Sequence, residues 1–498
     1  MIMHQKSLVP LEEALNIAGC GLYTHYVTFT TGTIYFCALM SCQSIAIVMP
    51  AIGCDLQLSD TTKGAISSMT FTGMLFSGQL FGFLADTFGR KRVVLYSQIT
   101  TAFLLAGCGL TPDTITMMVM LFLNGFVLTG VLTPAYVYVS EFTATKDRAT
   151  ALVVLTAIGA LANVYLPGMA WLLMPLNINL PIVGDMRFTS WRLFIILLTI
   201  PILLSTLLLL KLPESPKFLL SQGKPDETLE ILQSIYAINK KKRKDSFPVL
   251  SVCLDSDDQA CNKIVGSGNQ YLLYFKMMMR QTFVLFSKEY ISYTLLSCGL
   301  LFGIVGGFNT VFLWFPVQAH KIVDHSNNVD NYNVTLCDLM ASRISIDPVA
   351  HCHLDYSFFS YSIILGASQF VTCLMSSFVA KKMGRKHFLS LTTFLTTLLC
   401  FGTLFITSEY LTIGSIMSMT LLLYLAFPVS VSVIVEFFPT PLRSTATSII
   451  TMVGRLGATI GSQTIGALYE NYCEEGYIGM TIILGASFII CLILPVKK

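Results

Sequence analysis

The sequence predicts an all-α membrane protein in which 12 transmembrane helices form two pseudo-symmetric six-helix bundles. Three observations predict this fold class. Of the 498 residues, 54% are hydrophobic and only 12% are charged, whereas about 25% of an average soluble domain is charged. The apolar residues fall into runs close to the roughly 20 residues that a spanning helix needs. Several charged and glycine positions of the first half recur in the second half at one constant offset.

The predicted spans fall into two groups of six around a polar segment. Their approximate cores are 27–50, 65–85, 93–111, 115–140, 149–174 and 191–211, then 290–316, 355–380, 387–407, 411–435, 446–468 and 476–496. We predict an N-terminal bundle over 1–211, a cytoplasmic central loop over 212–289 and a C-terminal bundle over 290–498. The last includes a non-cytoplasmic loop over 318–354.

The central loop contains a predicted amphipathic helix. In "KPDETLEILQSIYAIN", Pro225 stands near a helix start and acidic residues fill the first turn. Leu229, Leu232 and Ile235 then follow at helical spacing. The run from Lys240 to Lys244 is interpreted as a solvated face near anionic lipid, with a dedicated partner site as the alternative. Residues 243–270 have the composition of a flexible linker.

Lysine and arginine collect in one set of loops, which predicts that both termini and the central loop are cytoplasmic. The start of the chain shows no cleavable signal peptide. Asn333 begins a glycosylation sequon in the loop on the other side of the membrane, where it can be modified, unless the tripeptide is fortuitous. Cys337 and Cys352 in the same loop can pair in an oxidising compartment, or remain as two free thiols.

The repeat relates four pairs of positions that each differ by 295. They are Arg90 and Arg385, Glu141 and Glu436, Arg148 and Arg443, and Gly159 and Gly454. The chain is therefore predicted to consist of two homologous halves. Parallel repeats of this kind are a transporter architecture.

Several motifs add a family resemblance over nearly the whole chain. "GFLADTFGRK" resembles the signature loop between helices two and three of the major facilitator superfamily, and "SFVAKKMGRK" is a degenerate second copy. "LPESPKFLL" is similar to the branch of sugar porters, organic-ion transporters and synaptic vesicle glycoproteins. "LEEALNIAGCG", "SWRLF" and "EFFPTPLRSTATSIITMVGRLGATIG" resemble the synaptic vesicle glycoprotein 2 and SVOP-like group. The resemblance implies the major facilitator fold and transmembrane transport.

The charges of the signature loop are predicted to form a conformational latch at the cytoplasmic ends of the helices. Glycines are expected where the backbone bends or packs closely, and Arg90 is expected to reach Glu141. Asp86 is expected to face the N-terminus of the eleventh spanning helix across the two halves. Charges that merely set the topology are the alternative. The predicted latch residues are Gly82, Asp86, Gly89, Arg90, Glu141, Arg148, Glu214, Gly384, Arg385, Glu436 and Arg443.

Arg148 and Glu214 are expected to extend the network of Arg90 and Glu141. The second-half latch is expected to be weaker, because Lys381 replaces the signature aspartate and the chain ends "LPVKK" without a counterpart of Glu214.

Arg455 is the leading candidate for a substrate contact. It lies about nine residues into the eleventh spanning helix, near mid-depth. An unpaired charge costs about 3 kcal/mol there, and no mid-depth carboxylate is visible. We predict that it binds an anionic group of the substrate; an arginine held by backbone carbonyls or snorkelling to the interface is the alternative.

Six further residues inside the spans are candidates to line the cavity, since aromatic walls suit organic solutes. Each is individually as consistent with helix packing. They are Trp171, Trp314, Asn309, Gln43, Asn124 and Tyr424. Tyr136, Asn163 and Gln369 are weaker candidates of the same kind.

The predicted function is secondary-type transport of a small organic solute, anionic or neutral, without a mid-depth proton-coupling carboxylate. Vesicle glycoprotein relatives carry acids in helix one and after the helix-seven tryptophan; here helix one has none and Val317 takes the later position. The alternative is a non-transporting vesicle protein that acts as a receptor or regulator. A channel is the third reading.

Soluble chemistry has no support in the sequence. Nucleotide-binding GxxxxGK[ST], metal-binding HExxH or CxxC, and nucleophile GxSxG patterns are lacking. We expect no enzyme activity, cofactor, metal or nucleotide, and a net charge of +3 gives no reason to expect nucleic acid. The expected setting is a monomer in the lipid bilayer of the plasma membrane or an intracellular vesicle.

Overall fold

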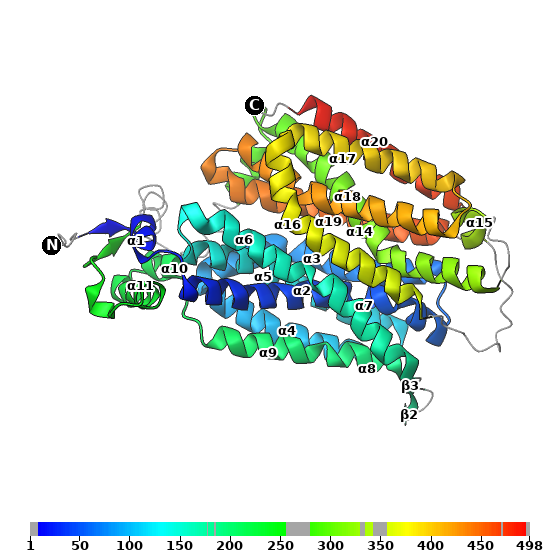
Figure 1. Ribbon diagram of the computed structural model, residues 1–498, viewed down its shortest axis with the longest axis horizontal. Coiled ribbons are helices and arrows are strands. Elements are labelled where there is room, and N and C mark those ends of the chain that lie inside the picture. The colour runs from blue at the N-terminus through cyan, green and yellow to red at the C-terminus, as the bar shows by residue number, and fades with distance from the viewer. Residues whose placement is uncertain are drawn as a thin grey trace.

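A computed structural model describes residues 8–176, 178–183, 186–254, 279–328, 334–341, 356–469 and 472–494. Long helices lie alongside one another in two groups, one from each half of the chain (Figure 1). Short elements cluster at the two ends of these groups. The all-α fold class predicted from the sequence is confirmed.

The N-terminal group matches the first six predicted spans. The fifth and sixth spans are each divided into two helices that meet at a single residue, Leu161 and Leu198 respectively. The elements are α2 (Leu22–Asp55), α3 (Asp60–Phe88), α4 (Arg90–Gly109), α5 (Thr114–Phe142), α6 (Thr145–Ala160), α7 (Ala162–Leu173), η1 (Met174–Leu176), α8 (Ser190–Leu197) and α9 (Thr199–Leu210).

The C-terminal group matches the last six. The elements are α14 (Ile291–Asn328), α15 (Leu336–Ala341), α16 (Phe358–Met383), α17 (Arg385–Gly402), η4 (Thr403–Phe405), α18 (Glu409–Ile434), η5 (Val435–Phe437), α19 (Thr440–Leu468) and α20 (Cys473–Ile493). The loop predicted over 318–354 is wrong in its first part, because α14 continues to Asn328. Gln318 is buried there and donates a hydrogen bond to the hydroxyl of Tyr477 (3.0 Å). Because this polar side chain has a partner inside the protein, the helix continues past Gln318.

Among the described residues, nine helical segments are long and apolar enough to cross a membrane. Helices α3, α4 and α19 occupy predicted spans but are not among the nine. Arg90, Lys91 and Arg92 open α4, while α3 and α19 pack against each other between the halves. Helices that face protein rather than lipid can carry more polar residues, which explains their lower hydropathy.

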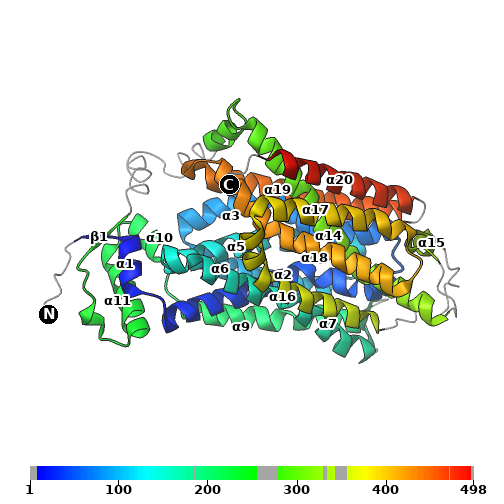
Figure 2. The same ribbon diagram turned by 45° about the horizontal axis from the view of Figure 1, so that its top comes forward.

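A compact unit stands at one end of the bundles, beside the start of α2 (Figures 1 and 2). It contains β1 (Val9–Pro10), α1 (Leu11–Ala18), α10 (Pro216–Ser221), α11 (Pro225–Lys240), η2 (Lys244–Ser246) and β4 (Val252–Cys253). The predicted amphipathic helix is α11, which starts at Pro225 and buries Leu232, Ile235 and Tyr236. Strand β4 pairs with β1 in parallel, so this part of the expected linker is folded.

The opposite end carries α15 and an antiparallel hairpin of β2 (Asn179–Val183) and β3 (Met186–Thr189) (Figure 1). The "SWRLF" segment joins the ends of α2 and α4 through hydrogen bonds. Trp191 Nε1 donates to Asp55 at the end of α2 (2.8 Å), and Arg192 donates to the carbonyl of Gly109 at the end of α4 (3.3 Å). The motif therefore has a structural role here.

A disulfide joins Cys337 in α15 to Cys473 at the start of α20. The predicted pairing of Cys337 with Cys352 is therefore wrong. The reason is that α15 packs against the first turn of α20, although 136 residues separate the two cysteines. Cys54 at the same end is also disulfide-bonded. Cys352 and Asn333 lie outside the described residues.

Candidate functional site

The signature turn between α3 and α4 requires glycine at one of its two predicted positions. Gly89 has φ 102° and ψ 146°, a region that other residues rarely adopt. A Cβ there would also collide with Oε2 of Glu214. Gly384 has a similar conformation in the second half, with φ 82° and ψ 131°. A Cβ on Gly82 would meet no atom within 4 Å, so the expectation of close packing at Gly82 is wrong.

Arg90 forms the predicted ion pair with Glu141. The nitrogen–oxygen distance is 3.2 Å, and both side chains are largely buried. Arg90 also pairs with Asp86 (2.9 Å) and lies over the ring of Phe218 (5.5 Å). Glu141 accepts a further hydrogen bond from the hydroxyl of Ser215. The result is a buried charge network that joins α3, α4, α5 and α10.

Glu214 caps the N-terminus of α4. Its Oε1 accepts from the backbone N–H of Lys91 (2.9 Å), in the first turn of the helix. A carboxylate is stabilised at this position by the otherwise unpaired N–H groups and the helix dipole. Glu214 therefore fixes the "PES" segment to the signature turn through the backbone.

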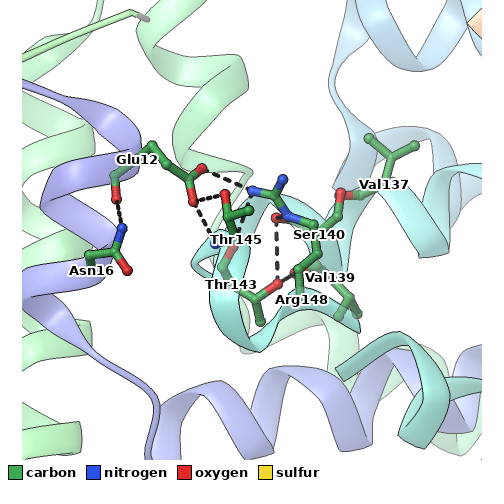
Figure 3. Close-up of polar contacts among 8 residues, drawn as sticks. All are labelled: Glu12, Asn16, Val137, Val139, Ser140, Thr143, Thr145 and Arg148. Carbon is green, nitrogen blue, oxygen red and sulfur yellow. Dashed lines mark hydrogen bonds and ion pairs between the residues drawn. The ribbon is translucent and has the colours of Figure 1, made fainter. Parts of the chain in front are cut away.

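Arg148 does not extend this network as predicted (Figure 3). Its guanidinium instead pairs with Glu12 of α1 (2.9 Å) and donates to the carbonyl of Ser140 (3.1 Å). Glu12 also accepts from the backbone N–H of Thr145 (2.5 Å), at the first residue of α6, and from its hydroxyl. Sequence reasoning missed this contact because 136 residues separate Glu12 from Arg148.

Glu12 is held in its ionised form by these contacts. Partial burial favours the neutral acid, but the hydrogen bonds from Thr145 and the charge of Arg148 outweigh burial and hold the pKa of Glu12 below its ordinary value. The carboxylate thus serves as an N-cap of α6 supplied by another helix. It fastens the N-terminal helix to the end of the bundle.

The second half repeats part of this arrangement. Arg385 pairs with Glu436 (2.5 Å), but these side chains are 40% and 43% exposed, against 12% and 7% for Arg90 and Glu141. Arg443 donates to the carbonyl of Phe438 (3.0 Å), five residues earlier, as Arg148 does to Thr143. Exposed pairs contribute little stability, which supports the expectation of a weaker second-half latch.

Each of the two arginine–glutamate pairs joins helices of a single half. They link neighbouring helices within each bundle but do not by themselves hold the halves together. The carboxylate of Asp86 is 66% exposed and pairs locally with Arg90. The contact of Asp86 with the N-terminus of α19 stays a prediction.

Arg455 of α19 reaches across the interface between the halves. Its Nη1 donates to the carbonyl of Met74 in α3 (3.0 Å). Within the described part of the chain its guanidinium has no ion pair and no second hydrogen bond. Cys42 and Tyr35 of α2 lie near its guanidinium. One nitrogen is therefore held by a backbone carbonyl, as the alternative interpretation expected, while the remaining donors have no partner among these residues.

Tyrosines from both halves gather near Arg455. The rings of Tyr35 and Tyr136 lie edge to face with centroids 5.0 Å apart. Tyr424 of α18 lies near Tyr35, and its ring packs beside Phe308 (5.7 Å). Tyr35 was not among the sequence candidates. Its spacing of seven residues from Cys42, which places both on one face of α2, is the signal that could have found it.

The amide candidates have different environments. Asn124 exchanges hydrogen bonds with Ser41, and Asn309 donates to the carbonyl of Val305 (2.8 Å). Both are satisfied within their own half. Gln43 is buried, and its Oε1 has no hydrogen-bond partner among the described residues. Gln43 therefore has unused capacity for a ligand, as do Asn163 through Oδ1 and Gln369 through Nε2, atoms that also have no hydrogen-bond partner among the described residues.

Neither tryptophan lies beside Arg455. Trp171 is 46% exposed near the end of α7, four residues after the buried Pro167. Its assignment to the cavity stays a prediction. Trp314 is buried within α14, and its Nε1 donates to the carbonyl of Ser462 (3.1 Å).

The two halves meet along α3, between Asp60 and Met74. A Cβ on Gly64 of α3 would come within 2.8 Å of the carbonyl of Ser462, so the backbones approach closely. Cross-half contacts follow along α3: Lys321 with Asp60 (3.6 Å), Gln463 with Ser68 (3.0 Å), Thr72 with Thr459 (3.5 Å) and Arg455 with Met74.

A second cross-half contact joins α7 and α16. Asn163 donates to Gln369, and a Cβ on Gly366 would collide with the carbonyl of Asn163. Both amides are buried. The two bundles are therefore in close contact on two sides.

Comparison with known families gives the classification. The family model described as Major Facilitator Superfamily matches residues 31–462, which is most of the chain. The chain belongs to the major facilitator superfamily. This membership accounts for the two groups of six spans, the repeated halves and the signature turn described above.

Similar curated proteins of the superfamily include synaptic vesicle glycoproteins. The chain is 25% identical over 329 residues to synaptic vesicle glycoprotein 2A of Rattus norvegicus, covering 63% of this chain and 44% of that protein. It is 24% identical over 325 residues to synaptic vesicle glycoprotein 2B of Homo sapiens, covering 63% and 48%. The chain thus spans less than half the length of these relatives.

Similar solved structures include transporters of the same fold. A partially occluded inward open conformation of the xylose transporter XylE from E. coli has a TM-score of 0.66 at 14% identity, covering 96% of this chain and 100% of that one. A bacterial homologue of the human lysosomal transporter Spinster, inward-facing and unoccupied, has a TM-score of 0.60 at 13% identity, covering 95% and 98%. At this identity the likeness concerns the fold.

Proposed function

We propose that this member of the superfamily is a secondary-type transporter that moves a small organic solute, anionic or neutral, by alternating access. The observation that carries the proposal is the position of Arg455. Its guanidinium lies midway along α19, bridges to Met74 of the other half, and has no carboxylate partner among the described residues. A cation left without a counter-ion at this depth is a functional site by default.

The proposed solute binds between the halves, with an anionic or strongly polar group on Arg455. Tyr35, Tyr136 and Tyr424 would supply hydroxyls and aromatic faces, and Gln43 an amide oxygen. Solute binding at the interface would replace the bond from Arg455 to Met74. Because the bond from Arg455 to Met74 crosses between the halves, its replacement by the solute would couple solute binding to the relative movement of the two halves.

We propose transport without a proton-coupling carboxylate in the pathway. In the spanning helices that the structure describes, each Asp and Glu lies within about two turns of a helix end. Glu141 and Asp60 are buried, and each is already paired, with Arg90 and with Lys63 respectively. Facilitated movement or exchange is therefore the favoured mode.

The proposed topology places α1 and α11 in the cytoplasm and the hairpin of β2 and β3 outside. The disulfide between Cys337 and Cys473 supports it, because disulfides persist in oxidising compartments. The cross-half contacts from Asp60 to Met74 would then close the outer side, and the conformation would be inward-facing.

Thermal unfolding of the purified protein with a panel of organic anions, sugars and organic cations tests the proposal. A ligand at 100 times its Kd adds about 2.7 kcal/mol of stability. We expect an organic anion to raise the Tm of the wild type but not that of Arg455→Ala. Stabilisation by a sugar or cation that survives the substitution would remove Arg455 from the site. A flat panel in folded protein would favour the non-transporting receptor or regulator.

A further inference from the structure

Five consecutive cations follow the body of α11 and are all exposed. Lys240 ends the helix, and Lys241, Lys242, Arg243 and Lys244 come next; together they are called the basic run. Within the part of the chain that the structure describes, none of the five forms an ion pair. The adjacent Asp245 supplies a single opposite charge. The basic run therefore keeps most of its positive charge uncompensated.

The basic run is fixed to the first turn of α2 through Asn239. The amide nitrogen of Asn239 donates to the carbonyl of Gly19 (2.6 Å) and the hydroxyl of Thr24 (3.1 Å), and its oxygen accepts from the N–H of Tyr23 (2.9 Å). Lys240 lies over Gly19, where a Cβ would come within 3.0 Å of its Nζ. The cations thus have a defined place at one end of a spanning helix.

That place adjoins an exposed apolar stripe of α2. Leu22, Tyr26 and Phe29 are 71%, 37% and 55% exposed and form a stripe along α2. At about 100° per residue this stripe lies on the opposite side of the helix from Tyr35, which faces the other helices. Since Leu22 is the first residue of α2, the apolar stripe begins beside the residues that hold the basic run.

We propose that the basic run docks on anionic phospholipid headgroups of the cytoplasmic leaflet and so holds α11 against the membrane. The inference rests on the proposed topology, which puts α11 on that side. Basic clusters directly beside a spanning helix attract anionic lipids, and each cation near the surface adds about fivefold to the binding constant at moderate salt. Figure 2 shows α11 at the end of the bundles, beside α1 and the start of α2.

The test is a titration of detergent-purified full-length protein with fluorescent phosphatidylserine and phosphatidylcholine, followed by anisotropy. The charge-removing variant is Lys242→Gln, Arg243→Gln and Lys244→Gln, which leaves Asn239, Lys240 and the helix cap Lys241 unchanged. We expect the wild type to prefer phosphatidylserine, and the variant to bind it at least about tenfold more weakly. Raising NaCl from 50 to 500 mM should weaken wild-type binding, since salt screens exposed charges.

The matched control keeps every charge: Lys242→Arg, Arg243→Lys and Lys244→Arg should bind phosphatidylserine like the wild type. Lys224→Gln, at the other end of α11, should also bind normally. Equal binding of both lipids by the wild type, or undiminished phosphatidylserine binding by the charge-removing variant, would overturn the proposal. Displacement of the lipid by 10 mM inorganic phosphate would show a phosphate site instead of membrane docking, and would overturn it as well.

Discussion

At the scale of single residues, glycine and arginine positions carry most of the specific chemistry of this chain. Gly89 turns the backbone where Glu214 approaches it, and Arg90 places a charge beside Glu141. Arg455 bridges the halves at mid-depth. Each of these is a local requirement that the surrounding apolar helices do not impose.

Replacement of Gly89 by alanine should destabilise the protein. The backbone conformation is nearly exclusive to glycine and costs of order 1–3 kcal/mol for other residues, and the added Cβ would displace Glu214 from the first turn of α4. Thermal unfolding should show a lower Tm for Gly89→Ala. Gly82→Ala is the matched control, because it places a Cβ in open space within a helix. Equal Tm values for the two variants would refute the assigned role of Gly89.

Sequence patterns identified several of these residues, and missed others for a physical reason. The charges of the signature loop predicted the pair Arg90–Glu141, and the offset of 295 identified Arg385 and Glu436 as the matching positions of the second half, where they also pair. The 46% exposure of Trp171 was not predictable, because composition gives the depth of a residue but not its direction. The approach of Tyr35 to Arg455 depends on packing between helices from different halves, which no local pattern encodes.

At the scale of elements, the spans were predictable because a bilayer demands long apolar helices. Interactions between distant elements were not. The disulfide of Cys337 with Cys473 and the contact of Glu12 with Arg148 both join segments more than 100 residues apart. The extension of α14 through Gln318 depends on Tyr477 from another helix.

The attachment of α1 to α6 should depend on pH through Glu12. Since the pKa of Glu12 is lowered on folding, its contribution is fully present above its ordinary value of 4.5 and is lost as the pH falls through the lower folded value. Hydrogen exchange of the α1 amides, corrected for intrinsic rates, should be constant from about pH 7 to pH 5 and accelerate below that range.

Glu12→Gln should accelerate this exchange at neutral pH, because a neutral amide is a weaker N-cap and leaves Arg148 unpaired. It should also remove the acid-dependent step. Glu230→Gln, an exposed change on α11, is the control and should behave as the wild type. An acid-dependent step that persists in Glu12→Gln would assign the titration to another group.

At the scale of the whole molecule, the topology predicts where reagents can reach. Cys20 is an exposed free thiol beside the start of α2, at the end that we place in the cytoplasm. A membrane-impermeant maleimide should label it only in permeabilised cells, with Cys20→Ser as the control for the labelled site. Labelling of Cys20 in intact cells would show that the proposed topology is reversed. This result would distinguish an error in the topology from an error in the lipid-docking proposal.

The two halves, their outer contacts and the central arginine form one account: a carrier whose outer side is closed and whose solute exchanges with the bond from Arg455 to Met74. The measurement that tests it most directly is uptake of the stabilising anion into proteoliposomes by the wild type and by Arg455→Ala. We predict saturable uptake by the wild type that falls at least about tenfold in the variant. Binding of the anion without any uptake by the wild type would contradict the account, and would identify a receptor built on a transporter fold.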